Sequence, residues 1–567
     1  MLSLPSLSAW LRSPRRGKKR TSSASPASSS TPSRATRPAA MEPLESRQLL
    51  TVYYVSPSGS DANPGTKRAP WQTLDRVSHH HFQGGDRILL EGGHTFNGTL
   101  YLGPDDKGSR AAPVAISSYG VGRARINGVQ DNGILIYNTG GVEISDINCS
   151  GPLGKGRGKG IMLFTDTPGH VKYDYVRIDQ IAAIRHHVGI EMGSTTGSGF
   201  RDVWITNSDV YNNVRGGLIT YAAERNVHEK VLVRRVHSFN NTGIAFPKGT
   251  RPTQGSGQGI LLGMVNAATV EYSVAHHNGE LGDAGAGIWT YNSNKVLFQF
   301  NESYSNKTAG DRDGDGFDFD QNVSNSVMQY NYSHDNDGAG YLMASHIDNA
   351  LHTNTVVRYN ISQNDNRKME YGALHIFGRI TNSQWYNNTV YQTANPSDRK
   401  NGYGIQVRNG GITNQDVKNV HFRNNSIYVT SGVKLVRVTA EQLEGGTDLR
   451  FEGNNYYASD KAFKFEWGDS DYSTFSSWRS GTGQERVNGQ NVGSNANPRH
   501  VEPTGGPTIG DADLLATVTA YRLQNDSPII NRGLNLAKLF NTNTGGRDFL
   551  GNPVPADSSD IGAFEFV

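Results

Sequence analysis

Cysteine is almost absent from this chain, which carries a single thiol, Cys149, in 567 residues. An internal disulfide and the paired-cysteine zinc sites are therefore excluded. Long apolar runs are also missing, because no stretch approaches the roughly 18 consecutive apolar residues that a membrane-spanning helix needs. The Gly-x-Ser-x-Gly elbow and the complete phosphate-binding loop Gly-x-x-x-x-Gly-Lys-Ser/Thr do not occur. We therefore expect no membrane span, no organic cofactor, and a fold held by packing and hydrogen bonds.

A surplus of basic charge is missing from most of the chain, although the formal net charge is +3. Residues 1–50 hold nine Lys/Arg and two Glu, which leaves 46 basic and 50 acidic residues in positions 51–567. The body of the protein is thus weakly acidic. A nucleic-acid partner, which a basic isoelectric point would suggest, is not expected.

Residues 1–50 have the composition of a disordered basic leader. Their Ser/Pro/Ala/Arg-rich tract, 21–40, has too few apolar residues to form a core. The segment that follows, Met41-Glu-Pro-Leu-Glu-Ser-Arg-Gln-Leu-Leu50, resembles the short Leu-Glu-x-Arg-x-Leu-Leu export motif near the N-termini of planctomycete proteins. The resemblance implies a secreted or cell-surface protein.

Glycine and asparagine are abundant, with 66 and 49 copies, and they recur periodically. A Gly followed by apolar residues at alternate positions repeats from residue 133 onward, with successive gaps of 27, 29, 28, 42, 28, 29, 24, 32 and 32 residues. The copies begin at Gly133, Gly160, Gly189, Gly217, Gly259, Gly287, Gly316, Gly340, Gly372 and Gly404. A period of about 28 residues with short strands between Gly/Asn turns is typical of a solenoid. The repeat is too short for a propeller blade, which needs about 40 residues or more.

We therefore predict an all-β fold, a right-handed parallel β-helix with N-terminal and C-terminal caps. The predicted divisions are a leader at 1–50, an N-terminal cap with the first coils at 51–130, the β-helix at 131–440, and C-terminal coils with a cap at 441–567. Within the last of these, residues 511–523 have a helix-like pattern. In each coil the residue after the Gly should point inward and the next one outward. Five asparagines at coil-like spacing are expected to stack as an amide ladder in one turn: Asn301, Asn331, Asn360, Asn388 and Asn425.

These features resemble the pectate-lyase-like β-helix superfamily of carbohydrate-active enzymes. The resemblance rests on the N-terminal segment Tyr54-Val-Ser-Pro-Ser-Gly-Ser-Asp-Ala-Asn-Pro-Gly-Thr66, on the coil pattern, and on Ser527-Pro-Ile-Ile-Asn-Arg-Gly533 with Asp560-Ile-Gly-Ala-Phe-Glu565. It implies a polysaccharide substrate and leaves lyase, hydrolase and non-catalytic functions open. In family-9-like pectate lyases a Gly-Phe-Lys-Leu strand carries the catalytic Lys. Here the corresponding stretch is Gly316-Phe-Asp-Phe319, with Asp318 in place of that Lys.

The densest acidic cluster of the chain runs from Asp311 to Asp320. Its first part, Asp311, Asp313 and Asp315 followed by Gly316, has the alternating oxygen ligands and turn glycine of the start of a calcium loop, without the Glu at the twelfth position. Either a bound Ca²⁺ or plain solvation of an acidic turn would relieve the repulsion among these carboxylates. We retain the three as candidate calcium ligands.

The second part of the cluster places Asp318 and Asp320 two residues apart on one expected strand, hence on the same outward face, about 6.5–7 Å apart along the backbone. This separation is close to that of the two carboxyls of an inverting glycosidase. Trp289 and Tyr291 occupy the equivalent positions one coil earlier, where they would stack on sugar rings. Asp337, one turn later, is a third candidate catalytic carboxylate.

A lyase would instead need a base near the α-proton of a uronate and a cation to acidify that proton. Lys368 is the candidate base. His334, Arg367 and His375 complete the substrate-binding candidates, although each has an ordinary reading as a surface or hydrogen-bonded residue.

The sequence thus predicts a secreted, monomeric β-helix protein that cleaves an acidic, uronate-type polysaccharide through carboxylate-mediated hydrolysis. Calcium-assisted β-elimination and a non-catalytic glycan-binding or cell-surface role are the alternatives.

Overall fold

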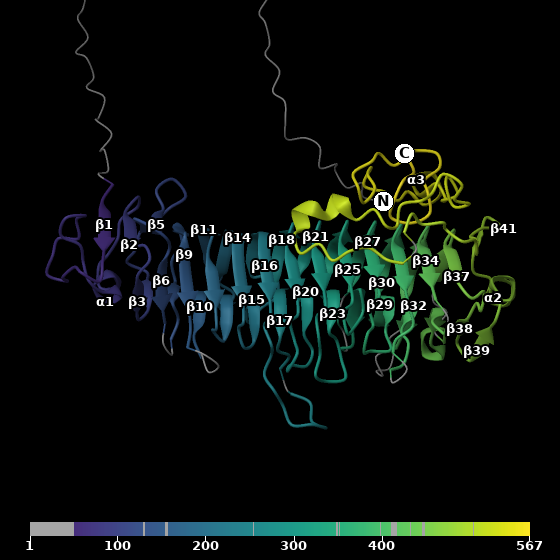
Figure 1. Ribbon diagram of the computed structural model, residues 1–567, viewed down its shortest axis with the longest axis horizontal. Helices are drawn as coiled ribbons and strands as arrows, with labels where there is room; N and C mark the ends of the chain where they lie inside the picture. The colour runs from purple at the N-terminus through teal and green to yellow at the C-terminus, as the bar shows by residue number, and fades with distance from the viewer. Residues whose placement is uncertain are drawn as a thin grey trace, which may run out of the picture. The chain divides into compact units, whose positions relative to one another are not determined.

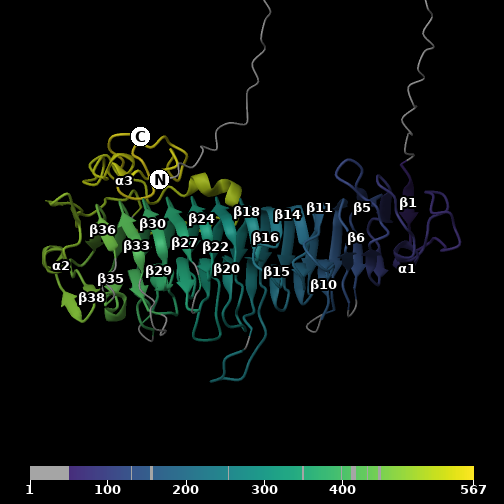
Figure 2. The ribbon, with the colours of Figure 1, turned by 180° about the vertical axis from the view of Figure 1, so that it is seen from behind.

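A computed structural model of the chain describes residues 50–128, 131–152, 157–252, 254–347, 350, 352–396, 399–409, 417–430, 432–444, 448–502 and 504–567. The predicted leader lies outside these residues, apart from Leu50. The described part forms one unit, a parallel β-solenoid whose coils stack along the long axis of Figures 1 and 2. The predicted β-helix fold is confirmed.

One wall of the solenoid is a 14-stranded sheet that is parallel except for its last pair. Its strands are β4 (Leu100–Leu102), β7 (Ile134–Tyr137), β10 (Lys159–Thr165), β13 (Val188–Ser194), β15 (Gly216–Tyr221), β17 (Gln258–Gly263), β20 (Ala286–Tyr291), β23 (Asp315–Asp320), β26 (Tyr341–Ser345), β29 (Gly372–Gly378), β32 (Tyr403–Arg408), β35 (Lys434–Val438), β38 (Phe465–Trp467) and β39 (Ser470–Tyr472).

A 25-stranded sheet folds around the rest of the core as two faces joined by the long strands β14 and β16. The first face contains β1 (Val52–Val55), β2 (Arg87–Glu91), β5 (Val114–Tyr119), β8 (Val142–Ser145), β11 (Lys172–Asp179), β14 (Gly199–Tyr211), β16 (His228–Phe239), β18 (Val265–Glu271), β21 (Asn294–Gln299), β24 (Ser324–Gln329), β27 (Thr353–Arg358), β30 (Thr381–Tyr386), β33 (Lys418–Arg423) and β36 (Leu449–Glu452). The second contains β3 (Thr95–Asn97), β6 (Ala124–Asn127), β9 (Ile147–Ser150), β12 (Ala182–Ile184), β19 (Val274–His276), β22 (Glu302–Tyr304), β25 (Tyr332–His334), β28 (Ile361–Gln363), β31 (Thr389–Gln392), β34 (Ser426–Val429) and β37 (Asn455–Ala458).

The predicted amide ladder is present. The Asn360 side chain donates to Asn388 Oδ1 at 3.0 Å and accepts from Asn331, and the series continues to Asn425 and Asn454. A second ladder, which the sequence pattern only partly indicated, contains Asn213, Asn241, Asn278, Asn306, Asn336 and Asp365. Both ladders are buried and satisfy backbone groups of neighbouring coils, so they fix the stacking register.

The recurrent Gly has a packing reason as well as a turn role. A Cβ at Gly316 would lie 2.1 Å from Ser333 Oγ and 2.9 Å from the Asn336 amide nitrogen, and Gly287 meets Ser303 and Asn306 in the same way. The glycines from Gly189 to Gly340 therefore make room for the second ladder, and any larger residue there would displace it.

Short helices and a folded-back tail finish the solenoid. The helical segments are α1 (Leu74–Ser78), α2 (Phe475–Thr482), α3 (Leu536–Phe540) and the 3₁₀ turns η1 (Ala440–Gln442) and η2 (Ala512–Thr517), and a small hairpin joins β40 (Arg486–Val487) to β41 (Gln490–Asn491). Strand pairing continues past residue 440 to β38, and Trp478 of α2 stacks on Phe465 at 4.6 Å to cover the last coil. Of the helix-like stretch 511–523, only η2 is helical.

After α2 the chain returns along the solenoid as a cover (Figures 1 and 2). Glu302 accepts hydrogen bonds from the backbone of Ile509 and Gly510, and the Asn387 amide donates to the carbonyls of Asp560 and Gly562. None of the helices in the described part has the length and apolar character that crossing a membrane requires.

Candidate active site

The strands that begin with the recurrent Gly build the candidate site on the outer face of the 14-stranded sheet. Strand pairing aligns Leu261, Trp289, Asp318, Leu342 and His375 in one column, each on its own coil. The residues just before them in sequence, such as Ile288 and Phe317, are fully buried in the core. The predicted inward and outward alternation is therefore correct, and it brings outward residues of successive coils about 4.8 Å apart.

A cavity of about 700 Å³ lies over this column. Its floor is formed by outward residues of β15 to β32, and its rim by the loop between β16 and β17 and by the segment that precedes β23. Four carboxyls line it, those of Asp311 at the rim and of Asp313, Asp318 and Asp320, together with Trp289 and Tyr291. The structure thus brings together residues predicted for catalysis, for sugar stacking and for metal binding.

Three of these carboxyls, those of Asp313, Asp318 and Asp320, reach the cavity by different routes. Asp318 and Asp320 project from β23, Asp318 in the column of Trp289 and Asp320 in a second column with Tyr291. Asp313 precedes the strand in a sharp turn, with Asp313 at φ 57° and Gly314 at φ 83°. A non-glycine residue with positive φ is uncommon, and Asp is among the residues that tolerate it.

Apolar surroundings keep these acids from ionising normally. One apolar cluster on the outer face contains Ile219 and Leu261 with Trp289, and another contains Leu342 with Tyr371, so the acids lie between them. Burial, together with the charge of neighbouring carboxylates, raises the pKa of Asp318 well above its usual range. Burial also raises the pKa of Asp320 to about 8, and that of Asp313 to about 6, where Arg312 opposes the rise.

Three buried polar atoms of residues that line the cavity have no hydrogen-bond partner. Within the described residues, Asp318 Oδ1, Asp320 Oδ1 and the Nε2 atom of His375 are buried and have no partner. His375 Nδ1 accepts from the Gly372 N–H at 3.2 Å, so the proton of the neutral ring lies on Nε2, which is therefore a donor. Burial lowers the pKa of His375 well below its usual range, which keeps the ring neutral. Buried polar groups without partners are rare, and at a cavity they mark positions for ligand atoms.

Four arginines surround the carboxyls. Arg251 pairs with Asp311 at 2.6 Å, and Arg312 pairs with the buried Asp283 at 2.8 Å. Arg215 and Arg408 also line the cavity but have no ion-pair partner among the described residues, and the Arg408 guanidinium lies 4.9 Å from the centre of the Tyr371 ring. The site therefore carries two cations that are free to meet an anionic ligand.

Aromatic residues also line the cavity. The Trp289 and Tyr291 rings lie 5.7 Å apart, and the Trp289 indole donates to Gln258 Oε1 at 2.7 Å. The Tyr371 ring stacks on His375 at 4.7 Å. Aromatic faces next to open polar groups are typical of sites that bind sugar rings through their C–H surfaces and hydroxyls.

Two predicted catalytic residues do not line the cavity. Asp337 is buried and accepts from the Thr308 N–H at 3.2 Å, with Lys307 Nζ 3.4 Å away. Lys368 donates from Nζ to the Thr308 carbonyl. Both residues therefore hold loops together behind the site.

Two predicted substrate-binding residues also lie elsewhere. His334 is buried in the other sheet between Glu302, at 3.1 Å, and Asp335, at 2.9 Å. Arg367 donates to the Thr393 carbonyl at 3.0 Å. Of the five substrate-binding candidates, Trp289, Tyr291 and His375 are at the cavity.

The three candidate calcium ligands point in different directions. Asp311 is exposed and paired with Arg251, Asp313 faces the cavity, and Asp315 is buried and accepts from the Ala339 N–H. In the described part of the chain, no group of three or more His, Cys, Asp or Glu side chains is arranged to hold a metal ion. The three side chains do not converge on one point, and Asp311 already pairs with Arg251, so this donor set does not form a Ca²⁺ cage.

Sequence reasoning missed Arg215, Arg251, Arg408, Tyr371 and Gln258. Gln258 carried a usable signal, since it directly precedes one of the recurrent glycines. Tyr371 carries the same signal before Gly372, and Arg408 lies on β32 in the column of Asp320. Arg215 and Arg251 come from segments whose length varies from coil to coil, where the period predicts nothing.

No protein-family model matches the chain. Among curated proteins it is similar to the lacto-N-biosidase of Bifidobacterium longum subsp. longum, with 25% identity over 459 residues, which cover 61% of this chain and 27% of that protein. The chain thus spans about a quarter of the length of this relative.

Among solved structures, the GH136 lacto-N-biosidase from Eubacterium ramulus is similar, with 17% identity, a TM-score of 0.49, and coverage of 71% of this chain and 66% of that one. The pectate lyase Pel9A is also similar, with 16% identity, a TM-score of 0.41, and coverage of 91% and 96%. The fold assignment rests on the strand pairing itself, and these scores are too low to carry a functional argument.

Proposed function

We propose that this protein is a glycoside hydrolase that cleaves an acidic oligosaccharide or polysaccharide in the cavity over β20, β23 and β26. The observation that carries the proposal is the convergence of Asp313, Asp318 and Asp320 in one cavity beside Trp289 and Tyr291. Asp318 and Asp320 each have an oxygen without a hydrogen-bond partner, as expected of a group that bonds to a ligand.

The proton for the leaving group comes from the pair Asp318 and Asp320. Because burial and mutual repulsion raise both pKa values, that of Asp320 to about 8, the pair holds a proton at neutral pH. Transfer of this proton to the glycosidic oxygen lets the C–O bond break with its electron pair on the leaving hydroxyl. A positioned general acid contributes about 10²–10⁴-fold to the rate.

The positive charge that develops at the anomeric centre is stabilised by Asp313. Its pKa of about 6 leaves it mostly ionised at pH 7. The carboxylate either attacks the anomeric carbon, forming a glycosyl ester that water hydrolyses in a second step, or accepts a proton from the water that attacks this carbon directly.

The substrate class follows from the charges around the acids. Arg215 and Arg408 need an anionic partner, and a sugar carboxylate supplies one. The rings of Trp289 and Tyr291 stack on the C–H face of a pyranose. These contacts favour a uronate-type or otherwise carboxylated sugar next to the cleaved bond.

The similarity to a lacto-N-biosidase supports glycoside cleavage, since that relative is named for a glycosidase activity. We extend only the reaction class to this chain, whose match covers 27% of the relative. The export-like leader supports action outside the cytoplasm, and we propose a monomer.

Lyase chemistry and a purely binding function remain the competitors to be tested. Lys368, the base predicted for β-elimination, is bonded to the Thr308 carbonyl and does not line the cavity. A binding protein would not need acids held protonated in an apolar site. Both observations favour hydrolysis.

The test incubates the full chain with a panel of uronate-containing and neutral oligosaccharides. New reducing ends are measured together with the ultraviolet absorbance of unsaturated uronates. Hydrolysis gives reducing ends without the absorbance, and a rise of both means β-elimination and refutes the proposal. No product from any substrate favours the binding function.

Variants connect the activity to the cavity. Asp318→Asn and Asp320→Asn should each lower kcat/KM by about 10²–10⁴-fold, because each removes part of the proton donor. Asp471→Asn, an exposed carboxyl on β39, is the matched control and should have wild-type activity. Full activity in both cavity variants would remove these residues from the mechanism.

A further inference from the structure

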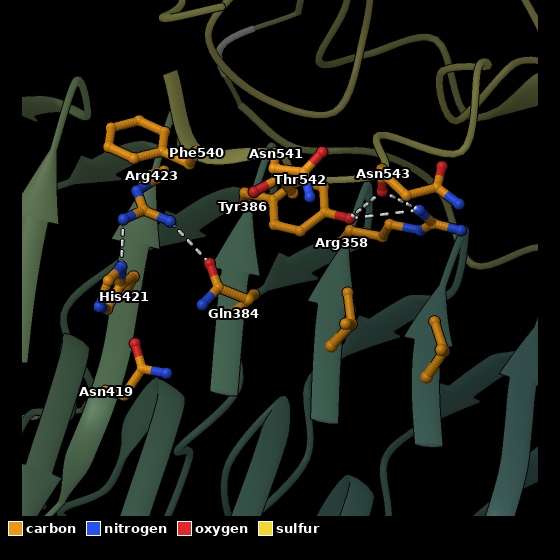
Figure 3. A pocket seen from close by; sticks show the side chains of 12 residues that line it. Arg358, Gln384, Tyr386, Asn419, His421, Arg423, Phe540, Asn541, Thr542 and Asn543 are labelled. Atoms are coloured by element: carbon orange, nitrogen blue, oxygen red, sulfur yellow. Dashed lines mark hydrogen bonds between the residues drawn. The ribbon is translucent and has the colours of Figure 1, made fainter. Parts of the chain in front are cut away.

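A second cavity, of about 530 Å³, lies on the first face of the 25-stranded sheet (Figure 3). Its floor comes from β24, β27, β30 and β33, and its wall from residues 540–543 of the folded-back C-terminal segment. It shares no lining residue with the candidate active site. We call it the tail groove.

The folded-back segment makes the tail groove by standing against the sheet. Arg358 donates to the Asn543 carbonyl at 2.7 Å, and the Tyr386 hydroxyl donates to the same oxygen at 2.7 Å. The Phe540 ring lies 3.6 Å from the Arg423 guanidinium. These contacts hold the wall open at a fixed distance from the floor.

Charge in the tail groove has one sign. Its twelve lining residues include Arg358 and Arg423 and no carboxylate. Arg423 pairs with Glu452 at 2.6 Å, but Arg358 has no ion-pair partner among the described residues, and its bonds go to neutral oxygens of Gln329, Tyr386 and Asn543. These neutral acceptors satisfy the guanidinium hydrogen bonds but leave its positive charge without a counter-charge, which an anionic ligand in the groove would supply.

The other lining groups match a sugar. Val327 and Val356 give an apolar floor, and Gln384, Asn419 and Asn541 supply amides. Gln384 uses its amide oxygen to accept from Arg423 at 2.7 Å, so its N–H groups face the groove (Figure 3). Gln384 and Asn419 lie on the neighbouring strands β30 and β33, and Asn541 lies in the wall. The volume is within the range of small-ligand sites, about 300–1,000 Å³.

We propose that the tail groove is a second, non-catalytic binding site for a carboxylate-bearing oligosaccharide. The sugar carboxylate lies toward Arg358 and Arg423, the ring faces rest on Val327 and Val356, and the hydroxyls bond the amides. A site of this kind would hold a long acidic substrate at the protein while another part of the chain is cleaved. It does not depend on the cavity being an enzyme site.

The experiment uses the full chain with Asp318→Asn, so that the ligand is not consumed. A tri-uronate and its carboxyl-reduced counterpart are titrated by calorimetry. Two sites are expected for the tri-uronate, one of which is lost in Arg358→Met or when Gln384→Trp fills the groove. Arg234→Met is the matched control, because Arg234 lies in the same outward column of the sheet, beyond the groove.

The expected loss at the groove site is at least 10-fold in affinity, with the cavity site unchanged. If Arg358→Met unfolds, Gln384→Trp alone decides, because it fills space and removes no charge. Unchanged stoichiometry in the groove variants overturns the proposal. Equal affinity for the tri-uronate and its carboxyl-reduced counterpart also overturns it. So does displacement of the tri-uronate from the groove by inorganic phosphate, if the length of a neutral sugar has no effect on binding.

The two proposals fail separately in this design. Absence of product in the activity panel leaves the stoichiometry of the titration untouched. Conversely, hydrolysis of a short substrate by the groove variants at the wild-type rate is expected whether or not the groove binds sugar.

Discussion

Replacing Asp320 by Asn should make the protein more stable at neutral pH while it removes activity. Asp320 has its pKa raised from 3.8 to about 8 by burial, so the folded state holds a proton that the unfolded chain has released. Where the folded state binds more protons, stability falls as the pH rises. The wild-type protein loses this stability between the unfolded pKa near 4 and the folded pKa near 8. The Asn variant does not lose it, because Asn does not titrate.

The magnitude follows from one proton per molecule. Each pH unit costs about 1.4 kcal/mol for a group that is protonated when folded and ionised when unfolded. Between pH 5 and pH 7 the stability difference between variant and wild type should therefore grow by about 2–3 kcal/mol in favour of Asn. The lower figure allows for Asp318 taking over part of the proton.

Urea unfolding at pH 5, 6 and 7, followed by tryptophan fluorescence, measures this difference. Asp471→Asn, on an exposed site, should change stability by less than about 0.5 kcal/mol at each pH. A stability difference for Asp320→Asn that stays constant with pH would refute the reasoning, because it would mean that this carboxyl ionises normally in the cavity.

Four further outcomes are expected. The pH profile of kcat/KM should be bell-shaped, with activity appearing near pH 6 as the base ionises and disappearing near pH 8 as the acid loses its proton; a profile flat from 5 to 9 contradicts the assignment. Trp289→Ala should raise KM by about 10-fold or more and affect kcat less, because stacking is worth about 0.5–1.5 kcal/mol beyond area burial. Asn360→Ala breaks four buried hydrogen bonds of the ladder and should cost about 3–4 kcal/mol in urea unfolding, whereas Asn495→Ala, at an exposed position with negative φ, should cost less than about 0.5. Chelation should leave the activity and the melting temperature unchanged, and a loss on chelation that Ca²⁺ restores would reinstate the calcium site.

The coil was predictable because stacking turns sequence period into spatial contact. A Gly followed by alternating apolar residues fixes which side chains enter the core, and this was enough to place Trp289 beside Asp318 in one outward column. The amide ladder through Asn360 followed from the same period. In such a fold each coil contacts mainly its neighbours, so local patterns carry most of the architecture.

The positions of side chains outside the strands could not be predicted from the period. Asp337 and Lys368 come from turns of the coils that follow the acidic cluster, and both bond to Thr308 and do not line the cavity. Arg251, from the loop between β16 and β17, lines the cavity instead. Loops between coils vary in length, so their side chains are positioned by contacts that no period records.

The solenoid, its outward columns and the carboxyls and aromatic rings on one of them follow from the amino-acid pattern, since they depend on alternation and repeat length. The folded chain sets which acids share a cavity, which arginines lie beside them, and the return of the C-terminal segment that forms the tail groove. Those features depend on desolvation and on contacts between residues far apart in the chain. Burial, which no local pattern specifies, is what gives Asp318 and Asp320 the proton that the proposed chemistry needs.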